Sequence, residues 1–331
     1  LPSAVTERLC ESSCRLATHA GYRSAGTAEF LYDPVTEAAC FLEVNSRLQV
    51  EHTVTECVTG VDLVHAQIDV ARGLPLTLSG VDRGDGKAPE PRGWAIQARL
   101  YAEDSSRGFA PSPGMLRIFR PPTGPGIRVD SGVEQGTSIA PEFDSMIAKV
   151  IGSGASRAQA IARLRRALTE LQVVVEDGAT NKALLLELLQ CPAFTDDVGT
   201  AAGVDTGWLD RALADRTVAA QKRTFEALIL AAIVEQRRRR RADIRAFFAA
   251  AQDGIPQDPP SPKPQSIDLC IGGQKASLTV ADLGGDRYLV GPADALHVAV
   301  VTFDGEHTGT LQINGERYVV WYAYGRKGIA I

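Results

Sequence analysis

Apolar and polar residues follow a helical spacing in several stretches of the chain. Residues 3–20 and 61–72 are predicted helices, and the second ends at a Gly-Leu-Pro sequence that stops helices. Ser156 begins another predicted helix, in which four apolar side chains share one face: Ile161, Leu164, Leu168 and Leu171. Residues 180–189 form a further predicted helix, capped by Thr180.

Two short stretches with strand character predict a β-hairpin. Residues 27–33 are apolar and aromatic, an Asp-Pro pair then indicates a turn, and residues 40–44 return. A hairpin closed around Thr36 pairs position 31 with 41 and position 29 with 43. Glu29 then faces Glu43, and like charges directly opposite each other destabilise a sheet. The pattern predicts a cation between these carboxylates; the alternative is an exposed hairpin whose glutamates point to water.

Polar side chains continue at every second position after the second strand of this hairpin. Asn45, Arg47, Gln49 and Glu51 follow Glu43 at this spacing, and an extended backbone sends alternate side chains to the same face. If the backbone stays extended past the strand, these groups converge on one small volume. Paired carboxylates with an amide oxygen suit a hard cation such as Mg²⁺. We therefore expect these side chains to form a functional site.

The middle of the chain, residues 94–151, is predicted to be rich in strands. In residues 94–101, Gln97 and Arg99 share one face of a strand, whereas the apolar side chains share the other. Arg99 is a candidate site residue, because a fixed cation can stabilise negative charge that develops in a reaction. The alternative is an arginine that reaches solvent from a strand edge.

A long helix is predicted from residue 223 to residue 251. Five apolar residues are expected to form its buried faces: Ile229, Ile233, Ile244, Phe247 and Phe248. The five consecutive arginines at 237–241 point all round such a helix. This favours a solvated segment that pairs with nearby acids over a nucleic-acid or lipid site. Residues 253–265 hold five prolines and are a predicted linker or long loop.

The last part of the chain, residues 266–331, is predicted to be all β. The expected strands are residues 266–271, 275–282, 287–290, 296–303, 308–313, 318–324 and 328–331. Gly-Gly, Asp-Gly and Asn-Gly pairs separate many of them and are hairpin signals. Short, evenly spaced strands favour a small antiparallel barrel. The long helix before it must bury its apolar faces, so we expect it to pack into or against this barrel.

Composition narrows the class of protein. A chain of 331 residues suggests two or three domains, and 44% hydrophobic residues are enough for full cores. A net charge of -5 and a pI near 5.7 argue against a nucleic-acid partner. We find no apolar run long enough for a membrane helix and no signal peptide. The six cysteines form no disulfide or zinc framework, which favours a reducing compartment.

Several motifs, in a fixed order, resemble biotin carboxylase, an enzyme with an ATP-grasp fold. They are residues 21–32 (GYRSAGTAEFLY), 41–52 (FLEVNSRLQVEH), 54–56 (VTE), 59–62 (TGVD), 97–104 (QARLYAED), 111–114 (PSPG), 143–149 (FDSMIAK), 160–163 (AIAR) and 180–181 (TN). The resemblance covers roughly residues 3–210. Small departures are Ser46 where threonine is usual, Thr53 where proline is usual, and Cys57 where methionine is common.

The resemblance implies an α+β fold with three parts. Residues 1–80 would be the C-terminal part of an ATP-grasp domain, and residues 81–215 the biotin carboxylase C-terminal subdomain. Residues 216–331 would be a linking domain, with the long helix at 223–251 and the antiparallel barrel at 266–331. The order of these parts is similar to that in propionyl-CoA, methylcrotonyl-CoA and single-chain long-chain acyl-CoA carboxylases.

The resemblance also implies a reaction and residue roles. The family uses ATP to activate bicarbonate and moves the carboxyl group to biotin. Glu29, Glu43 and Asn45 would hold Mg²⁺ or Mn²⁺ on the ATP phosphates. Arg47, Gln49 and the backbone of Val50 would bind bicarbonate. Glu51 would be the general base, and Arg99 would stabilise the enolate of biotin.

The expected partners are a biotin carboxyl carrier domain, a carboxyltransferase and further copies of the chain, with no nucleic acid or membrane. We expect a cytoplasmic protein, or one of the mitochondrial matrix if eukaryotic. No glycine-rich nucleotide-binding loop is found, so we expect a fragment that does not turn over ATP alone. Two alternatives are an assembly scaffold with an inactive carboxylase-like domain and an ATP-grasp ligase of the carbamoyl-phosphate synthetase type.

Overall fold

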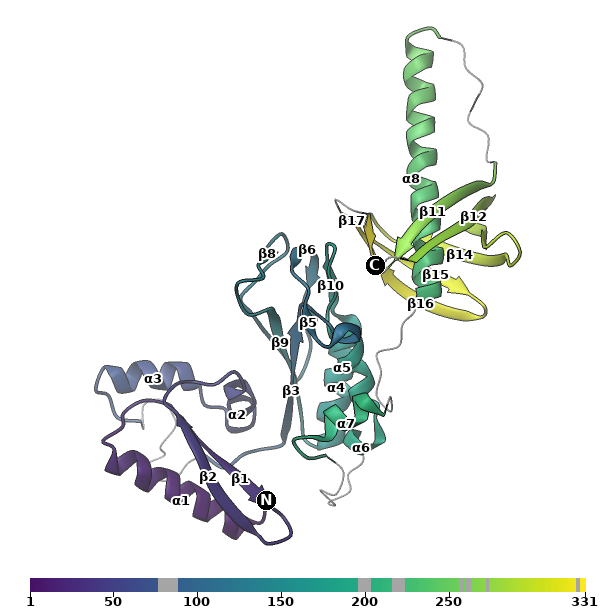
Figure 1. Ribbon diagram of the computed structural model, residues 1–331. Helices are drawn as coiled ribbons and strands as arrows, with labels where there is room; N and C mark the ends of the chain where they lie inside the picture. Colours follow the sequence, from purple (N-terminus) through teal and green to yellow (C-terminus); the bar gives the residue numbers. More distant parts are fainter. Residues whose placement is uncertain are drawn as a thin grey trace.

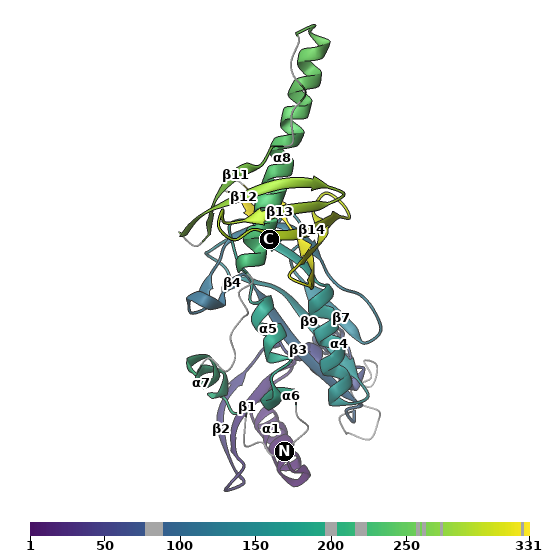
Figure 2. The same ribbon diagram turned by 90° about the vertical axis from the view of Figure 1, so that its right-hand side faces the viewer.

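The computed structural model describes three regions arranged one after another (Figure 1). The described residues are 1–76, 89–195, 204–215, 224–255, 259, 263–271, 274–325 and 328–331. The N-terminal region holds a hairpin and three helices. The central region holds small sheets covered by helices, and the C-terminal region is a curved sheet around a long helix. Figure 2 shows the same order of regions from the side.

The N-terminal region contains the predicted hairpin. Its elements are α1 (Ser3–His19), β1 (Thr27–Asp33), β2 (Ala38–Asn45), α2 (His52–Thr59) and α3 (Leu63–Ala71). Glu29 pairs with Glu43, as predicted. Position 31 pairs with Cys40 and not with 41, because a β-bulge next to Glu29 leaves Leu42 as an extra residue. The bulge restores the register just before the two glutamates, so they still lie opposite each other.

The central region is built on two three-stranded sheets. Its elements are β3 (Trp94–Tyr101), β4 (Glu103–Asp104), η1 (Ser105–Arg107), β5 (Ala110–Pro111), β6 (Gly114–Arg120), β7 (Ile127–Ser131), β8 (Ser138–Ile139), β9 (Met146–Gly154), α4 (Arg157–Glu170), β10 (Gln172–Val175), α5 (Lys182–Leu188), α6 (Pro192–Thr195) and α7 (Trp208–Ala214). The strand orders are β3-β9-β7 and β10-β6-β8. Ser156 caps α4 by accepting a hydrogen bond from the Gln159 N–H. All four apolar residues predicted for one face of α4 are buried.

One predicted helix cap in this region is wrong. Asn181, not Thr180, occupies the N-cap position of α5, and its side chain makes no cap hydrogen bond. That side chain instead holds β3: its amide donates to the Arg99 carbonyl at 3.0 Å and its oxygen accepts from the Tyr101 N–H at 3.0 Å. The amide therefore fixes the backbone on both sides of Leu100.

The C-terminal region contains α8 (Thr224–Gln252) and an antiparallel meander. Its strands are β11 (Gln265–Ile271), β12 (Gln274–Gly284), β13 (Arg287–Gly291), β14 (His297–Phe303), β15 (Thr308–Ile313), β16 (Glu316–Trp321), β17 (Ala323–Tyr324) and β18 (Ile329–Ala330). The first six form one sheet in sequence order, and β17 pairs with β18. Among the described residues β11 and β16 do not pair, so the predicted barrel is an open, curved sheet. The sheet bends around the first half of α8, which fills its concave side (Figures 1 and 2).

The second half of α8 projects beyond the sheet (Figure 1). Ile229 and Ile233 are fully buried, as predicted, but Ile244 and Phe248 are 37% and 61% exposed. The reason is length: a helix of 29 residues extends about 44 Å, which exceeds the span of these strands. Within the described residues, none of the helices combines the length and apolar character needed to cross a bilayer.

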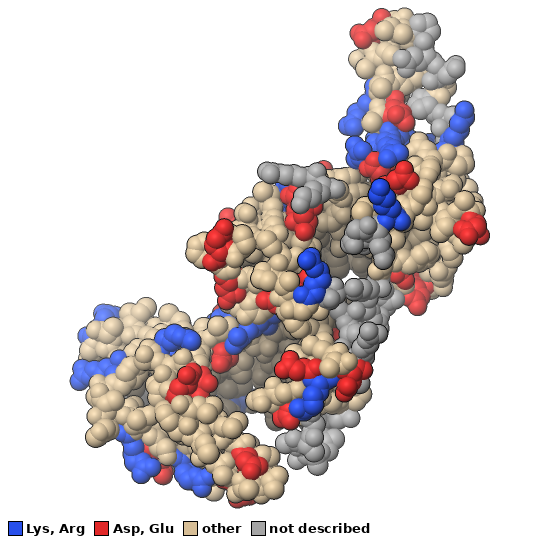
Figure 3. All heavy atoms as spheres, in the orientation of Figure 1, with Lys and Arg blue, Asp and Glu red and all other residues tan. Residues whose placement is uncertain are grey.

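Arg238, Arg239 and Arg240 of α8 pair with acids, as predicted for this run of arginines. Arg238 and Arg239 both contact Glu235, and Arg240 contacts Asp282 on β12. Arg237 instead stacks on the ring of Phe303, with its guanidinium carbon 3.7 Å from the ring centre. Figure 3 shows the basic and acidic side chains close together where α8 leaves the sheet.

Candidate active site

Glu29, Glu43 and Asn45 come together at the open end of the hairpin. The Asn45 amide nitrogen donates to one oxygen of Glu29 at 2.8 Å and to one oxygen of Glu43 at 3.0 Å. The Gln49 amide donates to the same Glu29 oxygen at 2.7 Å. Polar N–H groups therefore lie between the two carboxylates, where the sequence predicted a cation.

The donor set of this cluster suits a hard divalent cation. It offers two carboxylates and one amide oxygen, all from adjacent strands with little freedom to move apart. No group of three or more His, Cys, Asp and Glu side chains in the described part of the chain is placed to hold a metal ion. A cation at Glu29 and Glu43 would therefore need further oxygen ligands, such as the phosphates of a nucleotide.

The backbone does not stay extended as far as Glu51, so that expectation is wrong. Strand β2 ends at Asn45, and a loop leads through a turn at Val50 into α2. Arg47 is exposed and donates to the Leu48 carbonyl at 3.3 Å and to the Asn45 amide oxygen at 3.4 Å. The structure thus brings Gln49 to Glu29 and Arg47 to Asn45.

Glu51 lies apart from this cluster and pairs with Arg99. Glu51 is the N-cap residue of α2, and Arg99 is on β3. One guanidinium nitrogen lies 2.8 Å from a carboxylate oxygen. The two side chains are 41% and 52% exposed, and an ion pair of this kind contributes about 0–1 kcal/mol to stability. Both groups therefore remain accessible to a ligand.

A second contact joins α2 to β3 beside this pair. Thr53 is completely buried, and its hydroxyl donates to the Gln97 side-chain oxygen at 2.5 Å. Sequence reasoning gave neither residue a site role. The only available signals were the unusual threonine at position 53 and the alternation that places Gln97 on the face of Arg99.

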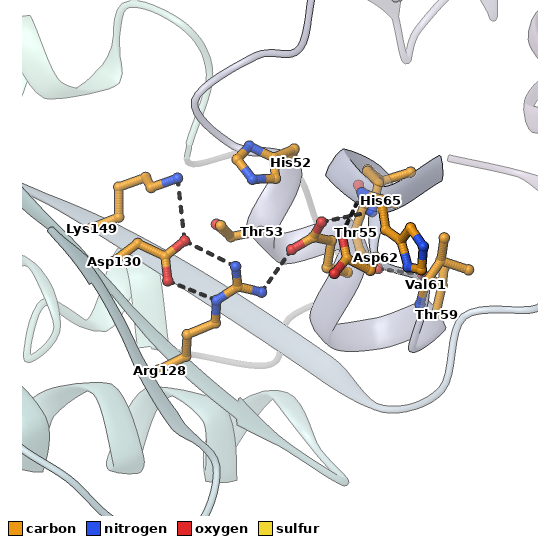
Figure 4. A network of polar contacts seen from close by, with 12 residues as sticks. His52, Thr53, Thr55, Thr59, Val61, Asp62, His65, Arg128, Asp130 and Lys149 are labelled. Carbon is orange, nitrogen blue, oxygen red and sulfur yellow. Dashed lines mark hydrogen bonds and ion pairs between the residues drawn. The ribbon is translucent and has the colours of Figure 1, made fainter. Parts of the chain in front are cut away.

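A partly buried ionic network, shown in Figure 4, links α2 to the central sheet. Arg128 donates to Glu56 at 2.7 Å and grips Asp130 through two bonds at 2.8 and 2.9 Å. Lys149 lies 3.5 Å from Asp130. The hydrogen bonds from Arg128 hold the pKa of Asp130 below its ordinary value despite partial burial. Sequence reasoning missed this network, although Glu56 lies in one of the recognised motifs.

Comparisons with known proteins match two parts of the chain to two different family models. Residues 97–211 match the family model described as the biotin carboxylase C-terminal domain. Residues 1–79, which precede it, match the ATP-binding domain of the carbamoyl-phosphate synthase L chain. Arg99, Arg128 and Asn181 therefore lie in the part similar to the biotin carboxylase C-terminal domain, whereas Glu29 to Glu51 lie in the part similar to the ATP-binding domain.

Individual relatives are biotin-dependent enzymes. "Biotin carboxylase 1" of Bacillus subtilis is 45% identical over 194 residues, which are 59% of this chain and 41% of that protein. The "Biotin-dependent acyl-coenzyme A carboxylase alpha3 subunit" of Mycobacterium leprae is 45% identical over 210 residues, 63% of this chain and 33% of that protein. The chain thus spans less than half of either relative.

A solved structure shows the same fold. The biotin carboxylase domain of the Hydrogenobacter thermophilus 2-oxoglutarate carboxylase, a dimer in complex with MgADP, ADP and bicarbonate, is 33% identical. The match has a TM-score of 0.56 and covers 64% of this chain and 44% of that one. The helix α8 and the C-terminal sheet lie outside both family matches.

Proposed function

We propose that this chain supplies half of a biotin carboxylase active site within a biotin-dependent acyl-CoA carboxylase. The observation that carries the proposal is the placement of two functional groups on either side of one domain boundary. The Glu29–Glu43–Asn45 cluster belongs to the ATP-binding part, and Arg99, which reaches Glu51, belongs to the carboxylase domain. The relative solved with MgADP and bicarbonate supports the choice of substrates.

Glu29, Glu43 and Asn45 would hold Mg²⁺ against the ATP phosphates. Mg²⁺, when bound, neutralises charge on the phosphates during phosphoryl transfer. The amide of Asn45 now donates to both carboxylates, and rotation of this side chain presents its oxygen to a cation instead. The hairpin supplies the rigidity, because the two glutamates are directly paired across it.

Arg47, Gln49 and the backbone at Val50 would bind bicarbonate. The guanidinium of Arg47 is exposed, and its hydrogen bonds within the described part of the chain are long, at 3.3 and 3.4 Å. A guanidinium can grip two oxygens of a planar anion at once. Arg47 is therefore free to exchange these weak contacts for stronger ones to an anion.

Glu51 would remove the proton of bicarbonate, and Arg99 would stabilise negative charge on the biotin ring. In the structure the two groups neutralise each other at 2.8 Å. In this pair the Arg99 guanidinium covers a carboxylate oxygen that would have to meet the bicarbonate proton. Entry of the substrates must therefore separate the pair, which releases Glu51 as the base and Arg99 as the fixed cation.

We further propose the domain limits 1–80, 81–215 and 216–331. The last region, with α8 and its sheet, would link the carboxylase to a carboxyltransferase, and a carrier domain would bring biotin to Arg99. The buried pairing of α8 with the sheet supports treating residues 216–331 as one unit. The scaffold and carbamoyl-phosphate synthetase alternatives are not favoured, because the relatives are biotin-dependent carboxylases.

The test is bicarbonate-dependent ADP release by the full-length parent protein, with and without free biotin. We expect biotin to stimulate ADP release. Replacing Glu51→Gln should lower the stimulated rate by about 10²-fold or more, because a general base contributes about 10²–10⁴-fold. Glu11→Gln, an exposed glutamate on α1, is the matched control. ATP turnover that is indifferent to biotin, or full activity of the Glu51→Gln variant, would refute the proposal.

A further inference from the structure

Two contacts between α2 and β3 are arranged like the rungs of a ladder. Glu51 meets Arg99, and two residues further along each element Thr53 meets Gln97. The residue numbers run in opposite directions, as in an antiparallel pair. The N-terminal end of α2 therefore lies across the face of β3 that carries both polar side chains.

The two rungs differ in exposure. The Glu51–Arg99 pair is 52% and 41% exposed, so solvent competes for both groups. Thr53 has no exposed surface, and its hydroxyl meets the Gln97 oxygen at 2.5 Å. Gln97 is half-buried, so loss of this hydrogen bond would leave its acceptor oxygen only partly compensated by water. The less exposed rung is therefore the one that fixes the spacing of α2 and β3.

The other side of Arg99 is also fixed. The Asn181 amide binds the Arg99 carbonyl at 3.0 Å and the Tyr101 N–H at 3.0 Å. The backbone of β3 thus cannot shift to follow α2. With β3 held in place, the position of the Glu51 carboxylate relative to the Arg99 guanidinium depends on where Thr53 anchors α2.

We propose that Thr53 is a positioning residue, whose hydroxyl sets the separation between the Glu51 carboxylate and the Arg99 guanidinium. The inference rests on the proposed function, in which Glu51 takes the proton of bicarbonate and Arg99 stabilises biotin. A small misplacement of one group relative to the other uncouples the two half-reactions, because catalytic groups act only over short distances. Bicarbonate-dependent ADP release then continues without matching transfer to biotin.

The experiment compares variants of the full-length parent by one ratio, biotin-stimulated over biotin-independent ADP release. This ratio does not depend on how much of each preparation is folded. Thr53→Val keeps the shape of the side chain and removes the donor, and we expect the ratio to fall about tenfold. Thr53→Ser keeps the donor and should restore the ratio. Thr55→Val makes the same change at an exposed position of α2 and should leave the ratio unchanged.

A second variant separates positioning from stability. Thr53→Val alone leaves the Gln97 oxygen without its donor, whereas Thr53→Val with Gln97→Leu removes both polar partners and should recover stability. If Thr53 acts by positioning, the double variant is stable and its ratio stays low. A wild-type ratio in the stable double variant would overturn the proposal. A wild-type parent that shows no biotin stimulation would instead refute the proposed function itself.

Discussion

The Asn45 side chain lies between two carboxylates of like charge, those of Glu29 and Glu43. Its amide nitrogen donates to Glu29 and Glu43 at once, so the two carboxylates lie close together without an opposite charge between them. Like charges at this spacing repel each other, and the amide N–H relieves the repulsion only in part. Such a cluster should become more stable when a divalent cation takes the place of the amide donors.

Removing one of these carboxylates should weaken the binding of Mg²⁺ by a measurable amount. We expect Glu29→Gln in the full-length parent to raise the Mg²⁺ concentration for half-maximal ADP release by about tenfold or more, because one charged ligand becomes neutral. The measurement is a Mg²⁺ titration at fixed ATP. Glu7→Gln, an exposed change on α1, serves as the control. An unchanged Mg²⁺ titration would show that Glu29 is not a metal ligand.

For single residues, the sequence predicted which side chains lie on the same face of a strand or opposite each other, but not the contacts between distant segments. Alternation correctly placed Glu29 opposite Glu43, and Gln97 beside Arg99. It failed after Asn45, because the period of two holds only while the backbone is extended. The Thr53–Gln97 bond joins segments 44 residues apart, and no local pattern encodes such a contact.

Among elements, α4 packs tightly against β9 in the central region. Gly152 on β9 faces α4, and a Cβ at this position would lie 2.6 Å from the Ala160 carbonyl and 2.7 Å from the Leu164 nitrogen. These are backbone atoms, which cannot turn aside as a flexible side chain can. The glycine therefore sets how deeply the predicted apolar face of α4 can pack.

Adding a methyl group at this contact should destabilise the chain. We expect Gly152→Ala to lower the free energy of unfolding by about 1–3 kcal/mol, the usual cost of overpacking a core. Gly132→Ala places the same group where no atom lies within 4 Å, and its stability should change little. Urea unfolding of both variants checks the difference. Equal midpoints for the two variants would contradict the proposed tight packing.

Strands could be predicted from the sequence where the alternation of side chains and the turn residues agreed. The strand at Trp94–Tyr101 and the strand at Thr308–Ile313 have the predicted bounds, because alternation and turn residues agree there. The cap of α5 was predicted wrongly, because the Asn181 side chain is used by β3. Whether the C-terminal sheet closes into a barrel could not be predicted from the sequence either, because the spacing of strands does not show whether the first and last strands pair.

In the molecule as a whole, a partly buried lysine lies between the central region and the C-terminal sheet. Lys182 of α5 lies 5.0 Å from the ring centre of Trp321 on β16 and donates to the Leu171 carbonyl at 2.6 Å. A small apolar cluster continues this contact: Ile118, Val174, Trp321, Ala323 and Ala330. Burial lowers the pKa of Lys182 to about 8.

This lysine should make the stability of the chain depend on alkaline pH. The unfolded chain keeps the proton up to an ordinary lysine pKa of 10.5, whereas the folded chain loses it near 8. The free energy of unfolding should therefore rise with pH between about 8 and 10.5, by an amount on the order of 3 kcal/mol. Lys182→Met keeps the apolar stem and should abolish the rise. Urea unfolding from pH 7 to 10.5 measures the difference between the two proteins, and parallel curves would contradict it.

The sheet that covers α8 has a consequence for how the chain is made. The apolar first half of α8 leaves the ribosome before any of the strands that enclose it, and the sheet is complete only at Trp321. At ordinary rates of synthesis this interval lasts roughly 5–20 s. During that time Ile229, Leu230 and Ile233 have no sheet to cover them. The nascent chain is thus prone to aggregation, and in need of a chaperone, while strands β11 to β16 are being made.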